Sequence, residues 1–131
     1  MLGIRRRTVL GGAVLALVFA AAGCGSDGPG GVPAGCTPIV GGETTLVARN
    51  LAWNTHCLRV PPGTKVTFTV RLEDEGVKHD LEVNGPSGRA KTDLETGPTT
   101  QTLTFTFDEP GRHRFVCTIH SRMEGDLFVE A

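Results

Sequence analysis

Residues 64–72 read Thr-Lys-Val-Thr-Phe-Thr-Val-Arg-Leu. Apolar and polar side chains alternate along this run, and its apolar side consists of Val66, Phe68, Val70 and Leu72. A period of two is typical of a β-strand with one buried and one solvated face, as in an antiparallel β-sandwich. The run therefore predicts a strand whose apolar side forms part of a core.

The rest of the chain repeats this pattern in shorter pieces and lacks helical periodicity. Thr100–Phe107 alternates again, with Leu103, Phe105 and Phe107 inward. Further strands are expected at Thr44–Leu51, Cys57–Val60, His79–Val83, Arg112–Cys117 and Asp126–Glu130. Turns are expected at Pro61-Pro62-Gly63, Asn84-Gly85-Pro86 and Glu109-Pro110-Gly111. Seven or eight short strands predict an all-β fold, a Greek-key β-sandwich, while the polar stretch Ser87–Thr99 indicates no particular element.

The first 23 residues predict an export signal peptide. A basic start at Arg5-Arg6-Arg7 precedes an apolar run of 14 residues, 9–22, which is too short to span a bilayer about 30 Å thick. The end of the run, Ala21-Ala22-Gly23-Cys24, resembles a lipobox, in which the cysteine is acylated, although Ala21 stands where leucine is usual. The alternative to the lipobox is an ordinary cleaved signal with a cysteine nearby by chance. Arg6-Arg7-Thr8-Val9-Leu10 also looks like a twin-arginine signal, although many plain export signals start with arginine pairs.

Residues 24–36 are rich in glycine and proline and predict a flexible tether anchored by lipid at Cys24. The remaining residues, 37–131, suit one compact domain. We therefore expect an exported lipoprotein on the extracytoplasmic face of the cell membrane, either periplasmic or extracellular.

The charge balance argues against a nucleic-acid partner. The chain has 13 Lys+Arg and 14 Asp+Glu. Without the three arginines of residues 5–7 the balance is 10 against 14, a formal charge of −4. Nucleic-acid binding needs clustered basic residues, so a mildly acidic domain does not suit it.

The stretch of residues 117–123, Cys-Thr-Ile-His-Ser-Arg-Met, carries the chemistry. It places a thiolate, an imidazole and a thioether three residues apart in succession, at Cys117, His120 and Met123. Copper that alternates between Cu(I) and Cu(II) suits two imidazoles and a thiolate with a weak axial thioether. His79 supplies the second imidazole, because its strand parity with Leu81 and Val83 points it inward. Each residue alone would be read as structural, but the combination predicts one copper ion per chain, whereas zinc would prefer four strong ligands.

Around these residues the chain resembles the cupredoxins, the type 1 blue copper proteins of the plastocyanin and amicyanin kind. Residues 111–125, Gly-Arg-His-Arg-Phe-Val-Cys-Thr-Ile-His-Ser-Arg-Met-Glu-Gly, match the C-terminal ligand loop of that family, with a short spacing like that of amicyanin. Val60-Pro61-Pro62-Gly63-Thr64 also fits. The resemblance extends over about residues 44–130 and implies one-electron transfer at copper, with His120 at the more exposed edge.

Two classes of function use this ligand set. The first is an electron carrier, a monomer that meets redox proteins at the outer face of the cytoplasmic membrane. The second is a copper carrier or scavenger that delivers metal to another exported protein. A metal-free interaction domain would require loss of ligands, and all four positions are filled. We expect no enzyme activity, because Cys117 is alone in the loop and His56 and His113 do not make a second site.

The chain departs from the family at two positions near the site. The family commonly has asparagine after the first ligand histidine, where this chain has Asp80, and tyrosine where it has His113. Asp80 could bridge the two ligand-bearing segments by accepting a hydrogen bond from Thr118. The alternative from strand parity is a solvated surface carboxylate.

The cysteines divide by role. With Cys24 assigned to lipid and Cys117 to copper, Cys36 and Cys57 remain in an oxidising compartment, and we predict that they form a disulfide. The alternative is two free thiols. Trp53 is expected in the core or at its rim, with no function implied.

Overall fold

The computed structural model describes residues 31–131, and the regular secondary structure within them consists of β-strands. Eight strands have four or more residues, in agreement with the predicted number, and four have two. The strands are β1 (Thr37–Pro38), β2 (Glu43–Arg49), β3 (Ala52–Trp53), β4 (Cys57–Val60), β5 (Thr64–Leu72), β6 (Lys78–His79), β7 (Glu82–Gly85), β8 (Gly88–Lys91), β9 (Glu95–Thr96), β10 (Thr99–Phe107), β11 (Gly111–Val116) and β12 (Glu124–Val129).

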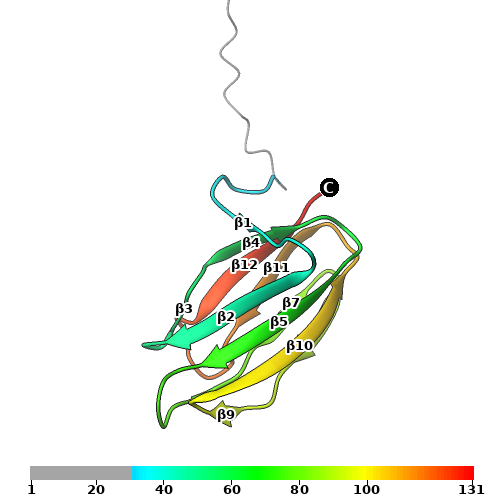
Figure 1. Cartoon of the computed structure of the whole chain (residues 1–131). Helices are drawn as coiled ribbons and strands as arrows, with labels where there is room; N and C mark the ends of the chain where they lie inside the picture. Colours follow the sequence, from blue (N-terminus) through cyan, green and yellow to red (C-terminus); the bar gives the residue numbers. More distant parts are fainter. Residues whose placement is uncertain (1–30) are drawn as a thin grey trace, which may run out of the picture.

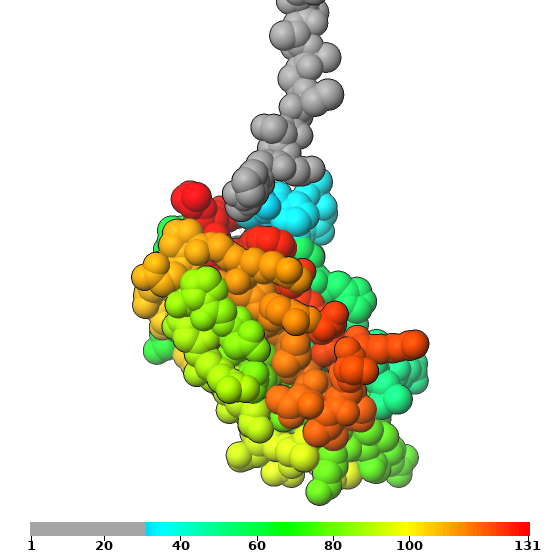
Figure 2. All heavy atoms as spheres, turned by 180° about the vertical axis from the view of Figure 1, so that it is seen from behind, coloured from blue at the N-terminus to red at the C-terminus, as the bar shows by residue number. Residues whose placement is uncertain are grey.

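The strands form two packed layers (Figure 1). One layer is a six-stranded sheet in the order β1-β4-β12-β11-β7-β8, and the other is a four-stranded sheet in the order β10-β5-β2-β3. Strands β6 and β9 pair separately at one end. Seen from behind, β7 and β8 (green) lie beside β11 and the loop that follows it (orange) (Figure 2). The predicted all-β sandwich is therefore confirmed.

The inward residues of both sheets form one core. Strand β5 contributes Val66, Phe68, Val70 and Leu72, as its alternation predicted, and each is essentially inaccessible to solvent. Burying an aliphatic or phenyl side chain of this size stabilises the fold by roughly 1.5–3 kcal/mol. Strand β10 lies at the sheet edge, where Leu103 and Phe105 are only partly buried against the core.

Strand direction differs from the antiparallel expectation. Strand β5 pairs antiparallel with β10 but parallel with β2, and β4 pairs parallel with both β1 and β12. Alternation reports that one face of a strand is buried and carries no information on the direction of its neighbours. The chain leaves the four-stranded sheet for β4 before it returns as β5, and this crossover makes β2 and β5 parallel.

The segment expected as one strand over His79–Val83 is two strands. Lys78–His79 pairs with β9, strand pairing stops at Asp80 and Leu81, and Glu82–Gly85 joins the six-stranded sheet. Both Asp80 and Glu82 are buried, so the outward parity inferred for Asp80 was wrong. The physical reason is that the chain changes its pairing partner between these two strands.

The remaining boundaries shift by a few residues. Strands β4 and β5 begin and end as predicted, while β2 ends at Arg49, and Asn50 and Leu51 form a turn with positive φ. The unplaced stretch Ser87–Thr99 contains β8, β9 and the first residue of β10.

The two ends of the sandwich carry different features (Figure 1). Residue 31, where the described part begins, lies at the same end as the C-terminus, and the loop between β11 and β12 lies at the other end. The Cys36–Cys57 disulfide is present as predicted, with a Cα–Cα distance of 4.7 Å. The predicted signal peptide (1–23), Cys24 and most of the tether lie outside the described residues. Among residues 31–131, no helix is long and apolar enough to cross a membrane.

Candidate metal centre

Three predicted ligands converge at the end of the sandwich. His79 ends β6, Cys117 directly follows β11, and His120 lies in the loop Cys117–Met123, which we call the ligand loop. Their ligand atoms all lie within 4.8 Å of one another. The Cys117 Sγ atom is 4.0 Å from Nδ1 of His79 and 3.4 Å from Nδ1 of His120. Both imidazoles thus present the same ring nitrogen to the sulfur.

Burial differs among these residues. His79 and Cys117 are buried, whereas His120 is partly exposed and lines a surface hollow with Leu51 and Ile119. The two imidazole rings lie 4.8 Å apart between centroids. The site is therefore closed on the core side and open to the surface at His120.

Met123, the predicted axial residue, is buried at the end of the ligand loop and lines a hollow together with Cys117 and His120. Its amide donates to the His120 carbonyl at 3.0 Å, and its carbonyl accepts from the Cys117 amide at 2.9 Å. These backbone hydrogen bonds close the loop on itself, so the first and last residues of the ligand loop are held side by side.

Burial favours the neutral forms of His79 and Cys117. Burial lowers the pKa of His79, against the opposing effect of its hydrogen bond with Asp74, and burial raises the pKa of the Cys117 thiol. A metal ion binds the deprotonated thiolate and the neutral imidazole. The histidine is thus ready for ligation, while the thiol loses its proton when metal binds.

Asp80 joins the two ligand-bearing segments. Its Oδ1 accepts from the Thr118 amide at 2.7 Å and its Oδ2 accepts from the Thr118 hydroxyl at 2.5 Å. Lys91 approaches the same Oδ2 at 3.6 Å. The carboxylate is completely buried, so the alternative of a solvated surface residue does not hold.

Two contacts of the site were missed from the sequence. The Oδ2 atom of Asp74 lies 3.0 Å from Nε2 of His79, and the Trp53 indole N–H donates to the Met123 carbonyl at 3.2 Å. Trp53 is a core residue, as expected, but it also supports the ligand loop. No motif marks either contact. The one available hint was an acidic residue in the turn shortly before His79.

The other two histidines lie outside the group. His113 is buried, and its ring packs edge-on against Phe107 and bonds Ser87. His56 contacts the backbone carbonyl of Glu124. Within residues 31–131, the only His/Cys/Asp/Glu group placed to hold a metal is the one formed by His79, Cys117 and His120.

Comparison with known proteins identifies the family. Residues 40–129 match the family model of the cupredoxin-like domain. Amicyanin-alpha of Methylorubrum extorquens is 30% identical over 122 residues, which covers 88% of this chain and 98% of that protein. The chain therefore belongs to the cupredoxin-like family, as its resemblance implied.

Solved structures share the fold. Dithionite-reduced auracyanin from the photosynthetic bacterium Roseiflexus castenholzii has a TM-score of 0.62 at 20% identity, with 69% of this chain and 98% of that chain covered. Auracyanin A, a "blue" copper protein of Chloroflexus aurantiacus, has a TM-score of 0.60 at 21% identity, with 71% and 99% covered.

The residues present fit a copper ion. One thiol and two imidazole Nδ1 atoms converge from the ends of two strands and one loop, with a buried methionine beside them. This mixture of soft sulfur and imidazole nitrogen suits copper in both oxidation states. His79, Cys117 and His120 would hold the ion, and Met123 is the candidate for a weak fourth contact.

Proposed function

We propose that this protein is an electron carrier with one copper ion held by His79, Cys117 and His120 and tuned by Met123. Copper bound there supplies one-electron chemistry between Cu(I) and Cu(II). The single observation that carries the proposal is that one buried thiol and two imidazoles converge in this chain, which belongs to the cupredoxin-like family.

The ligands are held by structure that resists movement. His79 and Cys117 lie at strand ends, and the ligand loop is closed by the hydrogen bonds that join Cys117, His120 and Met123. A site on rigid elements keeps its geometry better than a site on a loose loop. This favours electron transfer, which needs little rearrangement, over ready release of the metal.

The partly exposed His120 is the natural route for the electron. Its surroundings include Leu51 and Ile119, which are 49% and 51% exposed, and Arg122. Exposed apolar side chains of this kind suit a transient contact with a redox protein. We infer that redox partners approach this end of the sandwich and that the protein acts as a monomer without enzyme activity of its own.

We further propose that the chain is exported and anchored by lipid at Cys24. The Cys36–Cys57 disulfide supports an oxidising compartment. Residue 31 and the ligand loop lie at opposite ends of the sandwich (Figure 1), so an anchor on the N-terminal side would join the domain at the end away from the ligand loop. Mass spectrometry of the mature N-terminus tests this, and an unmodified N-terminus would leave a soluble exported protein.

The absorption spectrum of the purified protein with Cu(II) tests the copper site. We expect one copper per chain and an intense red absorption from the Cys117 thiolate. Cys117→Ser should remove the colour and leave the domain folded, whereas His56→Ala, outside the site, should retain both. A colourless wild-type protein loaded with Cu(II) would exclude the proposal.

A second measurement separates electron transfer from copper delivery, which would use the same ligands. Fast electron self-exchange with slow loss of Cu(I) to a competing chelator is the result we expect. Rapid handover of Cu(I) with slow self-exchange would instead assign the protein as a copper carrier.

A further inference from the structure

The carboxylate of Asp74 connects the buried ligand His79 to a surface turn that lies beside the partly exposed ligand His120. Asp74 lies in the turn after β5, and its side chain is 13% exposed. Its Oδ1 accepts from the Asn50 amide at 2.6 Å, and its Oδ2 accepts from the Leu51 amide at 3.0 Å. The same Oδ2 lies 3.0 Å from Nε2 of His79. Three hydrogen bonds thus converge on this single side chain.

The contact with His79 selects one form of the imidazole. An ionised carboxylate only accepts hydrogen bonds, and the backbone amides around Asp74 are donors, so the ionised form fits its surroundings. The proton between Asp74 and His79 therefore resides on Nε2. Nδ1 is then left without a proton, and Nδ1 is the atom that faces Cys117 Sγ. Asp74 thereby sets the tautomer in which the ligand nitrogen is free.

The contacts with the turn fix an unfavourable backbone. Asn50 and Leu51 have φ angles of 54° and 58°, and consecutive left-handed residues other than glycine cost about 1–2 kcal/mol each. Their two amides are held by Asp74. Leu51 is half-exposed and lines the surface hollow that also includes His120. The turn is therefore part of the rim around the exposed ligand.

We propose that Asp74 is a positioning residue of the metal site: it holds His79 with Nδ1 free for the metal and fixes the Asn50–Leu51 turn beside His120. This inference rests on the proposed copper site and adds a residue that sets its properties. Since a negative charge close to the site favours Cu(II) over Cu(I), Asp74 should also lower the reduction potential.

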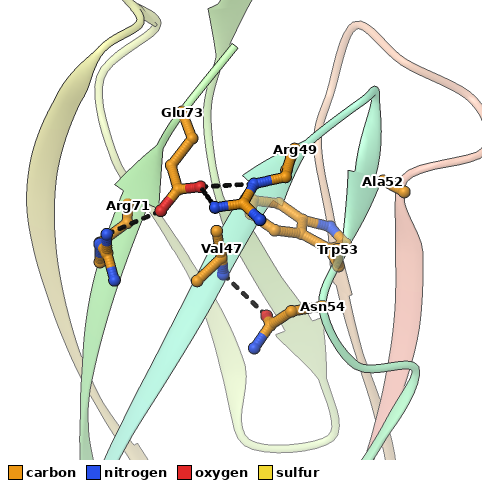
Figure 3. Close-up of a pocket in the computed structure, with 7 residues that line it drawn as sticks. All are labelled: Val47, Arg49, Ala52, Trp53, Asn54, Arg71 and Glu73. Carbon is orange, nitrogen blue, oxygen red and sulfur yellow. Dashed lines mark hydrogen bonds and ion pairs between the residues drawn. The ribbon is translucent and has the colours of Figure 1, made fainter.

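The neighbouring carboxylates provide matched controls. Glu73 is occupied by Arg49 and Arg71 on the four-stranded sheet (Figure 3). The side chain of Glu75 is exposed. No hydrogen bond joins either side chain to His79 in the described part of the chain, although both lie next to Asp74 in the sequence. Their removal changes the charge by the same amount and leaves the histidine contact intact.

The decisive variant is Asp74→Asn in the full chain, with Glu75→Gln as its control. The introduced amide side chain can still accept from the Asn50 amide through its one oxygen. Its NH2 group takes the place of Oδ2, so it has lost the charge and the acceptor for the Leu51 amide, and it can present an N–H to His79. We expect the ratio of Cu(I) to Cu(II) binding constants to rise about tenfold, which is a potential increase of about 59 mV for a one-electron couple. Metal affinity should fall by about 10- to 100-fold. Glu75→Gln should leave the affinity unchanged and move the potential by much less.

A measurement without copper tests the tautomer directly. In the copper-free wild-type protein, nitrogen NMR of His79 should show the proton on Nε2, and Asp74→Asn should introduce the Nδ1-protonated form. A wild-type proton on Nδ1, or a variant with the potential and tautomer of the wild type, would overturn the role of Asp74. Failure of the wild type to bind copper would instead reject the proposed function. If Asp74→Asn does not fold, the nitrogen NMR spectrum of the copper-free wild type still tests the role of Asp74, because it shows which nitrogen of His79 is protonated.

Discussion

Asp80 and Thr118 are joined by two hydrogen bonds between segments that are 38 residues apart. The Asp80 carboxylate accepts from the amide of Thr118 at 2.7 Å and from its hydroxyl at 2.5 Å. These residues directly follow the ligands His79 and Cys117. The bridge therefore fixes the separation of an imidazole and the thiol from one side, while the ligand loop fixes Cys117 relative to His120 and Met123.

The Asp80 bridge also determines charge near the metal. We expect Asp80→Asn to keep the blue colour and raise the reduction potential, because loss of a buried negative charge destabilises Cu(II). A tenfold change in relative binding corresponds to about 59 mV, and we expect a shift of this order. Voltammetry at neutral pH measures it, and a potential equal to that of the wild type would show that the carboxylate charge does not reach the site.

Substitution of Lys91 should shift the reduction potential in the direction opposite to Asp80→Asn. Its ammonium lies 3.6 Å from Asp80 and partly offsets the carboxylate charge. Lys91→Gln should therefore lower the potential, by less than Asp80→Asn raises it, since the lysine side chain is 48% exposed and solvent screens it. Lys65→Gln, in β5, serves as a control for loss of one positive charge. Shifts of the same sign in Asp80→Asn and Lys91→Gln would contradict a charge effect.

Met123 is expected to tune the site without holding the metal. Met123→Leu conserves volume in a buried position and should cost less than about 1.5 kcal/mol of stability. Loss of a weak axial sulfur destabilises Cu(II), so we expect copper to stay bound and the potential to rise by at least about 59 mV, a tenfold change. The measurements are copper content and voltammetry. An unchanged or lower potential would remove Met123 from the ligand set.

His113 should make the fold sensitive to acid. The ring is buried against Phe107, its Nε2 accepts from the Ser87 amide at 3.0 Å, and burial lowers the pKa of His113 below its usual value. The unfolded chain therefore binds a proton more readily than the folded chain. The free energy of unfolding should fall as the pH drops below about 6.5 and through the folded pKa, by at most about 1.4 kcal/mol per pH unit from this residue.

The variant His113→Phe isolates that contribution. It keeps an aromatic ring beside Phe107 but cannot accept from Ser87, so stability at neutral pH should fall by about 1–3 kcal/mol. The difference between wild type and variant should shrink as the pH decreases, because only the wild type has this proton to take up on unfolding. Denaturant unfolding between pH 4 and 7 measures both curves, and parallel curves would show that His113 does not contribute.

The sequence was sufficient where one local pattern determines one structural feature. The alternation of residues 64–72 predicted β5, and the spacing of Cys117, His120 and Met123 identified a loop that brings the first two together with His79. The remaining contacts depend on tertiary structure. Asp74 meets the Asn50–Leu51 turn across 23 and 24 residues, and Trp53 meets Met123 across 70. No periodicity reports such pairs.

The wrong orientation inferred for Asp80 also arose because tertiary structure decides it. Parity through His79, Asp80 and Val83 assumed a continuous strand, but the chain leaves β9 and joins β11 within that segment. When a chain changes its pairing partner, the alternation of inward and outward side chains does not continue from one strand into the next. Parity alone therefore places the Asp80 carboxylate outward, whereas it is buried and forms the bridge to Thr118 that the sequence also suggested.

The Cys36–Cys57 disulfide should contribute stability without affecting the metal site. It joins the start of the domain to β4 and closes a loop with a sequence separation of 21. Chain-entropy arguments give about 3 kcal/mol for a loop of this size. The double variant Cys36→Ala/Cys57→Ala should therefore lose about that much free energy of unfolding and keep its copper spectrum and potential, because the bond lies outside the group of His79, Cys117 and His120. Denaturant unfolding of the copper-free proteins measures the loss, and reduction of the wild type should reproduce it. A changed spectrum at full copper content would mean that the disulfide supports the site as well as the fold.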